Sequence, residues 1–294
     1  MYATKALSLT LLFLALTLGC SKDGSSASQE PGELLEKSPK RGLAYNLSDA
    51  ADLEALKSGV SWWYNWYFAT DAPGDYNSNY QMEFLPMLWG NNSPANFAQV
   101  KNFILAHPEI KYLLVLNEPN LTDQANQSPT QAATDWVAYE QLLDDLAAEQ
   151  RTVELVDPQI TWGTMPGFED PIVWMDAFYA AYQAANNGAD PRIDYLAFHW
   201  YDYGLASQLD RLQKYGKKIW VTEMANWNAN ISSYEQQAEQ MTQMVAICEN
   251  RSDVFRYAWF IGRGDTPDNN YTYLFTPNPG ELNSLGELYL SLPY

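Results

Sequence analysis

Two glutamates, Glu118 and Glu223, each stand at the end of an apolar run that is typical of a buried β-strand. Glu118 ends the run YLLVLNE, and Glu223 ends the run KIWVTE. A carboxylate in such a place is costly to desolvate unless it has a partner or a function. A structural salt bridge is the alternative for either residue alone, but the chain offers only 17 Lys+Arg against 36 Asp+Glu. Two such carboxylates therefore indicate a catalytic pair.

A pair of facing carboxyl groups can cleave a glycosidic bond. One group protonates the leaving oxygen, and the other attacks the anomeric carbon. The acid of such a pair must keep its proton near neutral pH, and burial beside a second carboxylate is a common means. A separation of about 5–5.5 Å gives retention of configuration and about 6.5–9.5 Å gives inversion. The sequence does not give this distance, so the residues alone leave both outcomes open.

Polar side chains beside the same strand ends are candidates for holding a substrate. Asn117 precedes Glu118, and a short amide there can bind a sugar 2-hydroxyl, whereas a turn-forming asparagine is the alternative. His199 and Tyr201 are two residues apart in the run LAFHWYD, so their side chains point to one side of a strand. One of them can hydrogen-bond the nucleophile and the other a sugar hydroxyl. A histidine satisfied within the core is the alternative for His199.

Several of the 11 tryptophans also fall at predicted strand ends. A flat indole face can bury the apolar C–H face of a pyranose ring, while its N–H group bonds a hydroxyl. Any single tryptophan can equally belong to the core, and the alternation of side chains along the strand points Trp200 away from the site. We therefore expect the substrate cleft to be lined by Trp66, Trp89, Trp259, Asn65 and Trp227.

These residues need a scaffold that brings distant strand ends together. The chain alternates short apolar runs with helical patterns. Several of the runs are apolar almost throughout, as expected for parallel strands that are covered on both faces. Eight strands are predicted, at residues 42–45, 61–67, 83–89, 112–116, 153–161, 194–199, 218–222 and 255–260.

Seven helices are predicted after these strands. Ser48 and Ser93 are the expected N-caps of the first two, and Pro94 suits a first helical turn. Residues 71–82 are rich in turn formers, so a loop is expected there in place of a helix. The helices are predicted at residues 49–57, 93–106, 130–149, 170–185, 205–215, 233–250 and 281–291.

Eight strands and seven helices in alternation predict an α/β fold, a (β/α)8 TIM-like barrel with a reduced helix set. In such barrels the working residues lie at the C-terminal ends of the strands, which is where both glutamates fall. An open doubly wound sheet is the alternative, but no GxGxxG motif follows a strand. No linker is visible after residue 40, so residues 41–294 are predicted to form a single catalytic domain.

The composition limits the partners. The formal net charge of −19 makes the chain a poor ligand for a phosphate backbone, so no nucleic acid is expected. Only 2 Cys and 2 His leave little for a disulfide scaffold or a transition-metal site, and no metal or cofactor is expected. Cys248 lies in an apolar helical stretch and is expected to be a buried core thiol. We expect a monomer.

The N-terminus carries the marks of export. An apolar run of about a dozen residues follows Lys5 and is too short to span a bilayer, so residues 1–19 are predicted to be a signal peptide. The sequence LTLGC resembles a bacterial lipoprotein box, which makes Cys20 the predicted lipid anchor; ordinary cleavage with Cys20 left free is the alternative. Residues 20–40 form the predicted tether. The expected location is the bacterial cell envelope, with membrane contact only through the lipid.

A series of motifs in fixed order resembles glycoside hydrolase family 128, the β-1,3-glucanases with the "glycosyl hydrolase catalytic core". The resemblance covers residues 41–294 and implies a retaining double displacement with Glu118 as acid/base and Glu223 as nucleophile. It also implies a neutral β-1,3-glucan substrate, such as laminarin or curdlan, and we expect endo-acting cleavage. The motifs are Tyr64-Asn65-Trp66, Pro86-Met87-Leu88-Trp89-Gly90, Leu116-Asn117-Glu118-Pro119-Asn120, Phe198-His199-Trp200-Tyr201, Trp220-Val221-Thr222-Glu223 and Arg256-Tyr257-Ala258-Trp259-Phe260.

Two other functions stay open. The first is a non-catalytic surface protein that binds β-1,3-glucan on the same fold, against which the intact pair Glu118 and Glu223 argues. The second is a retaining glycosidase that acts on another neutral glycan, such as a β-1,4-glucan or a mannan. The chemistry of the residues alone does not separate this second function from a β-1,3-glucanase; only the motif series does.

Overall fold

The computed structural model describes residues 34–90, 92–227 and 229–294. The predicted signal peptide, Cys20 and most of the predicted tether lie outside these residues. Residues 35–294 form one compact unit, so the last part of the predicted tether belongs with the catalytic domain. The reason is visible at Lys37, whose ammonium group donates to the carbonyl oxygens of Lys57, Val60 and Tyr80 at 2.9, 2.7 and 3.2 Å.

The sheet of this unit is wholly parallel. Among the described residues, nine strands pair in the order β3-β2-β1-β9-β8-β7-β6-β5-β4. Strands that are neighbours in sequence therefore pair with each other, except β3 and β4, and the first strand β1 also pairs with the last strand β9. The strands are β1 (Arg41–Ala44), β2 (Trp62–Tyr64), β3 (Glu83–Phe84), β4 (Met87–Leu88), β5 (Tyr112–Val115), β6 (Glu154–Ile160), β7 (Tyr195–Trp200), β8 (Ile219–Met224) and β9 (Val254–Trp259).

The two edges of this order, β3 and β4, are halves of one extended segment interrupted at Leu85-Pro86. The N–H of Leu85 donates to the carbonyl of Trp63 at 2.9 Å, and the N–H of Leu114 donates to the carbonyl of Pro86 at 3.0 Å. The segment thus bonds β2 with its first half and β5 with its second half, and so closes the sheet. Counted as one strand, β3 and β4 reduce nine strands to eight, which confirms the predicted (β/α)8 barrel.

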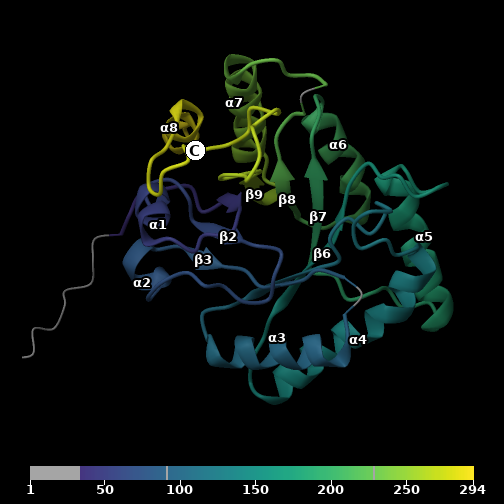
Figure 1. The fold of residues 1–294 in the computed structure, drawn as a ribbon. Coiled ribbons are helices and arrows are strands. Elements are labelled where there is room, and N and C mark those ends of the chain that lie inside the picture. Colours follow the sequence, from purple (N-terminus) through teal and green to yellow (C-terminus); the bar gives the residue numbers. More distant parts are fainter. Residues whose placement is uncertain (1–33, 91, 228) are drawn as a thin grey trace, which may run out of the picture. The chain divides into compact units, whose positions relative to one another are not determined.

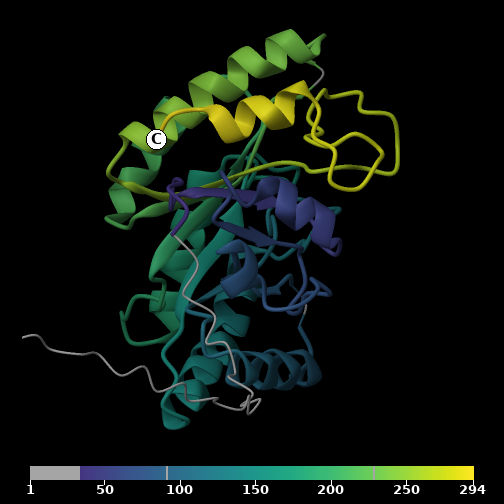
Figure 2. The same ribbon diagram turned by 90° about the vertical axis from the view of Figure 1, so that its left-hand side faces the viewer.

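The helices lie on the outer side of the strands (Figures 1 and 2). Figure 2 shows α7 and α8 side by side over the strands, in line with the contacts between the two helices. The helices are α1 (Ala50–Leu56), α2 (Tyr76–Tyr80), α3 (Pro94–Ala106), α4 (Pro129–Ala148), α5 (Pro171–Ala185), α6 (Leu205–Leu212), α7 (Tyr234–Asn250) and α8 (Ser284–Ser291), and a 3-10 turn covers Gln213–Tyr215. No helix of the described residues is long and apolar enough to cross a membrane.

Two local predictions were wrong. The interval 71–82 contains the five-residue helix α2, because the side chain of Asp75 accepts from the N–H of Ser78 and caps it. Helix α1 is capped by Asp49, which accepts from the N–H of Ala51, and not by Ser48. The cap of α3 is as predicted, with Ser93 accepting from the N–H of Asn96.

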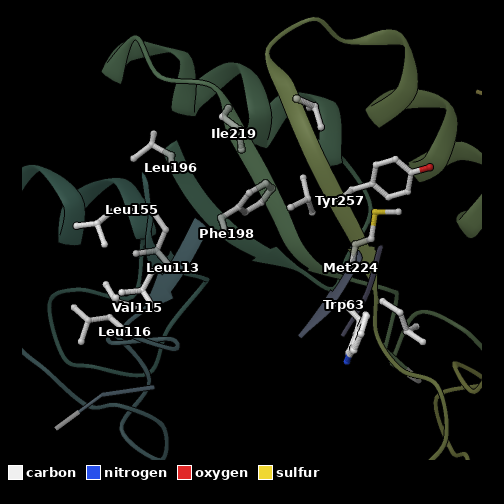
Figure 3. Close-up of a cluster of buried hydrophobic side chains, with 14 of the residues drawn as sticks. Trp63, Leu113, Val115, Leu116, Leu155, Leu196, Phe198, Ile219, Met224 and Tyr257 are labelled. Carbon is white, nitrogen blue, oxygen red and sulfur yellow. The ribbon is translucent and has the colours of Figure 1, made fainter. Parts of the chain in front are cut away.

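The core has two layers, set by the alternation of side chains along the strands. One layer lies between strands and helices and includes Leu196, Phe198 and Ile219 (Figure 3). The other fills the barrel interior and includes Ala197 and Trp220, the sequence neighbours that point the opposite way. The interior is therefore packed, and an open site can form only beyond the strand ends.

Candidate active site

Strands β5 and β8 bring the two glutamates to the same end of the barrel. Glu223 lies within β8, and Glu118 lies three residues beyond the last residue of β5. The backbone of Glu118 is in the left-handed region, at φ 47°, which is uncommon for a residue with a side chain and recurs at functional sites. Its N–H donates to the carbonyl of Gln159 on β6 at 2.8 Å. The bent strand end is thus fixed to the neighbouring strand.

A single imidazole stands between the two carboxylates. The Nδ1 atom of His199 lies 2.8 Å from Oε1 of Glu118 and 3.4 Å from Oε2 of Glu223. One carboxylate oxygen of each glutamate and a ring nitrogen of His199 all lie within 4.8 Å of one another. His199 is fully buried, and the two glutamates are 8% and 4% exposed. The predicted pair is therefore a contiguous, nearly dehydrated site.

Three hydrogen-bond donors converge on Glu223. The hydroxyl of Tyr64 and the indole N–H of Trp66 donate to Oε1 at 2.7 and 2.8 Å. The hydroxyl of Tyr201 donates to Oε2. Tyr64 lies in β2 and Trp66 in the turn after it, while Tyr201 directly follows β7, so the donors reach the carboxylate from both sides of β8. Hydrogen bonds to an ionised carboxylate are among the stronger ones in proteins.

The burial of the site shifts its protonation equilibria. Burial raises the pKa of Glu223, and the charge of Glu118 adds to the rise, while His199 and the hydrogen bonds from Tyr201 and Trp66 oppose it. Burial lowers the pKa of His199, but the two carboxylates outweigh burial and the net pKa is raised. Burial, together with the charge of Glu223, raises the pKa of the Tyr64 and Tyr201 phenols well above the ordinary value. Both hydroxyls therefore stay protonated and donate.

A cleft of about 480 Å³ opens over the glutamates. Five of the predicted substrate-binding residues line it, namely Asn117, Tyr201, Trp66, Trp89 and Trp227. His199 lies beneath them, against both carboxylates. The ring of Trp227 stacks on that of Tyr201 with centroids 4.3 Å apart, so the cleft has a rigid aromatic wall.

Two predicted cleft residues lie elsewhere. Trp259 is fully buried in the layer between strands and helices, where its indole N–H donates to the carbonyl of Thr272 at 2.8 Å. The next residue, Phe260, has the opposite orientation and lines the cleft instead. The amide of Asn65 donates to Oδ1 of Asn46 and to the carbonyl of Ala69, so it shapes the turn after β2 and does not line the cleft.

Several residues of the site were not predicted from the sequence. Tyr64 could have been found, because it is two residues before Trp66 and so points to the same side of β2. Gln124, whose amide oxygen accepts from Asn117 at 3.3 Å, lies in a loop without periodicity and gave no signal. Leu121, Thr161, Trp162 and Phe260 complete the lining.

The donor set could also hold a metal ion. Among the described residues, one cluster has ligand atoms close enough to share a metal ion, and it consists of Glu118, His199 and Glu223. The imidazole nitrogen that would have to bind the metal is already hydrogen-bonded to Glu118. As it stands, the arrangement places a proton-carrying imidazole beside two carboxylates. Glycoside hydrolysis needs one carboxyl group that is protonated and a second that is ionised, on either side of one carbon atom.

The chain matches one family over most of its length. The family described as the glycosyl hydrolase catalytic core matches residues 42–289. That range includes every residue of the cleft and all nine strands but for Arg41, the first residue of β1.

Individual relatives agree with this match. A family 128 (subgroup II) endo-β-1,3-glucanase from Pseudomonas viridiflava is 52% identical, with a TM-score of 0.82, over 88% of this chain and 100% of that chain. A family 128 (subgroup I) endo-β-1,3-glucanase from Amycolatopsis mediterranei, solved in complex with laminaritriose, is 28% identical, with a TM-score of 0.62, over 86% of this chain and 99% of that chain. Alkali-sensitive linkage protein 1 of Schizosaccharomyces pombe is 30% identical over 86% of this chain, which spans only 45% of that longer relative.

Proposed function

The chain belongs to the glycosyl hydrolase catalytic core family, as a member of glycoside hydrolase family 128, and on this premise we propose that it is a retaining endo-β-1,3-glucanase. Glu118 is the general acid and base, and Glu223 is the nucleophile. The observation that carries the proposal is the pair of contacts from one imidazole nitrogen, at 2.8 Å to Glu118 and 3.4 Å to Glu223.

The spacing of the carboxylates supports a double displacement. Oxygens of Glu118 and Glu223 lie within 4.8 Å of each other. An inverting enzyme needs about 6.5–9.5 Å between its carboxyl groups, to leave room for a water molecule, whereas a retaining enzyme has about 5–5.5 Å. The shorter separation favours direct attack by one carboxylate on the sugar.

The surroundings of the two carboxylates support their separate roles. The three donors on Glu223 stabilise its ionised form, which is the form that attacks. Glu118 faces Nδ1 of His199, whose raised pKa lets the imidazole hold a proton beside this carboxylate. A proton on this imidazole can pass to Glu118, so the carboxyl group can be supplied with a proton from within the site.

The reaction then proceeds in two steps. In the first, an oxygen of Glu223 attacks the anomeric carbon, the glycosidic bond breaks, and Glu118 gives its proton to the leaving oxygen. In the second, Glu118 takes a proton from water, and the water oxygen attacks the same carbon and releases Glu223. Two inversions at one carbon retain the β-configuration.

A neutral β-1,3-glucan is the substrate that the comparisons and the charge support. Two relatives are named as endo-β-1,3-glucanases, and one of them was solved with laminaritriose. The net charge of −19 disfavours anionic polysaccharides. The aromatic side chains of the cleft suit the apolar faces of glucosyl rings.

Substitution of the two carboxylates tests the proposal. Glu118→Gln and Glu223→Gln should each lower laminarin hydrolysis by about 10²–10⁴-fold or more, while circular dichroism and the melting temperature stay those of a folded protein. Glu239→Gln on the exposed side of α7 is the control and should keep wild-type turnover. Wild-type turnover in Glu223→Gln would contradict the mechanism.

The two roles can be separated with azide and an activated aryl β-laminaribioside. In Glu118→Ala, azide should attack the glucosyl ester and give the β-glycosyl azide. In Glu223→Ala, azide should replace the missing nucleophile and give the α-glycosyl azide. The opposite assignment of anomers, read by NMR, would mean that the roles are exchanged.

A panel of polysaccharides separates the alternative functions. Binding of laminarin without release of reducing ends by the wild type would indicate a binding protein. Preference for a β-1,4-glucan or a mannan would indicate another glycosidase. Mixed oligosaccharides early in the reaction, sized by chromatography, are expected for endo cleavage, whereas a single small product would contradict it.

For the location, we propose export and lipid attachment at Cys20, on the support of the apolar run and the LTLGC sequence before it. The wild-type chain should fractionate with membranes of its bacterial host and carry an acylated N-terminal cysteine by mass spectrometry. Cys20→Ser should move the protein to the soluble fraction. A wild-type chain that is soluble and unacylated would contradict the proposal.

A further inference from the structure

A second cavity, of about 430 Å³, adjoins the catalytic cleft. It shares Thr161, Trp162, Tyr201 and Trp227 with the cleft, so these four residues lie between the two spaces or border both. Its volume falls within the range of about 300–1,000 Å³ that is typical of small-ligand sites. Its remaining lining residues are His199, Trp200 and Asp202.

Two buried polar atoms belong to residues that line this cavity and lack a partner. Nε2 of His199 and Nε1 of Trp200 have no hydrogen-bond partner among the described residues. His199 is fully buried and Trp200 is 9% exposed. Both atoms are shielded from the cavity by their surroundings, so the groups that lie open to a ligand here are Trp162 and Asp202.

Trp162 provides an open aromatic face at the same place. Its side chain is 51% exposed, which is unusually high for a tryptophan. The guanidinium group of Arg211 lies 5.4 Å from the centre of its ring and is itself held by Asp170 at 2.5 Å. Cation–π contact of this kind fixes one face of an indole, and the exposed remainder of the ring is left for a sugar.

The loop that carries Trp162 is attached to the segment that carries Glu118. Asn120 is fully buried, and its side-chain amide donates to the carbonyl of Thr161 at 2.6 Å. The carbonyl of Asn120 accepts from the N–H groups of Thr164 and Met165, both at 3.0 Å. The position of Trp162 is therefore tied to the position of the proposed acid. Tyr64 and Trp66, which hold the proposed nucleophile, come from β2 and the turn after it, and β2 is not adjacent to β6 in the sheet.

We propose that Trp162 and the adjoining cavity bind the glucosyl unit on the leaving-group side of the scissile bond. The reasoning rests on the proposed function, because it takes Glu118 as the acid that protonates the leaving oxygen. The sugar that departs from Glu118 then lies against Trp162, and Asp202, which is exposed and also lines the cavity, can accept from its hydroxyls. The same place receives the water, or the sugar acceptor, that resolves the ester on Glu223.

Two substrates test this assignment. Laminarihexaose places glucosyl units on both sides of the cleaved bond, whereas β-laminaritriosyl fluoride leaves the leaving-group side without a sugar. Trp162→Ala should lower kcat/KM for laminarihexaose at least tenfold and change fluoride release less than twofold. Trp162→Phe, which keeps an aromatic face, should restore most of the loss. Tyr294→Ala removes a 62% exposed aromatic at the C-terminus and is the control.

A transfer assay gives a second readout that a merely structural role would not move. With the fluoride as donor and laminaribiose as acceptor, the wild type should form longer oligosaccharides. An acceptor hydroxyl attacks the anomeric carbon of the ester, gives its proton to Glu118 and releases Glu223. Trp162→Ala should lose the transfer product while still releasing fluoride.

Three outcomes would overturn the inference. They are an equal loss on both substrates, no loss on laminarihexaose, and transfer that persists in Trp162→Ala. A wild type that is inactive on both substrates would contradict the proposed function instead. In that case a binding measurement tests the subsite without catalysis. By calorimetry, laminarihexaose should bind about tenfold more weakly to Glu223→Gln/Trp162→Ala than to Glu223→Gln. Equal binding to the two variants would overturn the assignment of Trp162.

Discussion

At the scale of residues, Glu223 combines burial with three converging donors. Burial raises its pKa, while the hydrogen bonds from Tyr201 and Trp66 lower it. The proposed nucleophile must be ionised, so activity should be lost as the pH falls through this raised pKa. The acidic limb of the pH profile of kcat/KM should therefore lie above the range of an ordinary glutamate.

Tyr201→Phe tests the part of this balance that one hydroxyl supplies. The substitution removes a donor that stabilises the carboxylate, so the pKa of Glu223 should rise further and the acidic limb should move to higher pH. The matched control is Tyr203→Phe, because the hydroxyl of Tyr203 donates to the carbonyl of Asn230 and not to a carboxylate of the site. An acidic limb that stays in place or moves to lower pH in Tyr201→Phe would contradict the argument.

The two glutamates of the candidate site could be located from the sequence because their signal is local. A glutamate after an apolar strand is visible without any neighbour, and the spacing of His199 and Tyr201 correctly placed both beside the carboxylates. The prediction that Trp259 lines the cleft was wrong, because the alternation of side chains defines two faces of a strand but does not say which face points into the barrel. On β9 the inward residues include Arg256, whose charge in a barrel interior is explained by its ion pair with Glu83 and by the aromatic rings around it.

At the scale of elements, the loop after β6 depends on a close approach at Gly163. A Cβ atom there would lie 2.2 Å from the carbonyl oxygen of Asn120. Any side chain must therefore push the Trp162 loop away from the segment of the proposed acid. Nothing in the sequence pattern signals this contact, because it joins two irregular segments.

Gly163→Ala should cost about 3 kcal/mol of unfolding free energy, as other overpacked contacts do, and should lower laminarin turnover. The control is Gly167→Ala in the same loop, where a Cβ meets nothing within 4 Å but φ is 83°. It should cost only about 1–2 kcal/mol and keep activity. The melting temperature measures both losses, since it falls by about 2–4 °C per kcal/mol. Equal falls for the two variants would contradict the claim that the contact of Gly163 with Asn120 limits the side chain at this position.

At the scale of the whole molecule, the closure of the barrel involves an ion pair inside it. Arg256 on β9 contacts Glu83 on β3 at 2.6 Å, and its guanidinium lies 4.8 Å from the ring centre of Trp220 and 4.9 Å from that of Tyr112. These residues belong to the early part of their strands, away from the cleft. In barrels of this kind the N-terminal ends of the strands serve stability, and the active site lies at the C-terminal ends.

Arg256→Ala should therefore destabilise the fold without changing the chemistry. Loss of one partner of a largely buried pair costs about 3–5 kcal/mol when burial is complete, and about 2–4 kcal/mol is expected here, where the side chains are 14% and 18% exposed. Urea unfolding measures the loss, and kcat should stay within about twofold. Arg192→Ala, which breaks an exposed pair with Asp144, should cost less than about 1 kcal/mol. A large fall in kcat for Arg256→Ala would contradict this division.

The barrel as a whole followed from the alternation of runs, because eight strands with covering helices leave few other arrangements. The closure of the barrel could not be predicted in the same way. Residues 83–88 pair with β2 in their first half and with β5 in their second half, and these pairings join segments far apart in the chain. The attachment of residues 35–40 was equally invisible, because Lys37 reads as a tether residue until its three carbonyl partners are known.

The buried amide of Asn120 has a consequence for producing the protein. Asn120-Leu121-Thr122 is an acceptor triplet for N-linked glycans, and the nitrogen that would receive the glycan is the one that donates to Thr161. A host that glycosylates chains during secretion would modify Asn120 before the barrel closes. The attached glycan would then hold the loop of Trp162 away from Glu118, so material from a glycosylating yeast should be less active than material from a bacterial host, and Thr122→Ala should remove the difference.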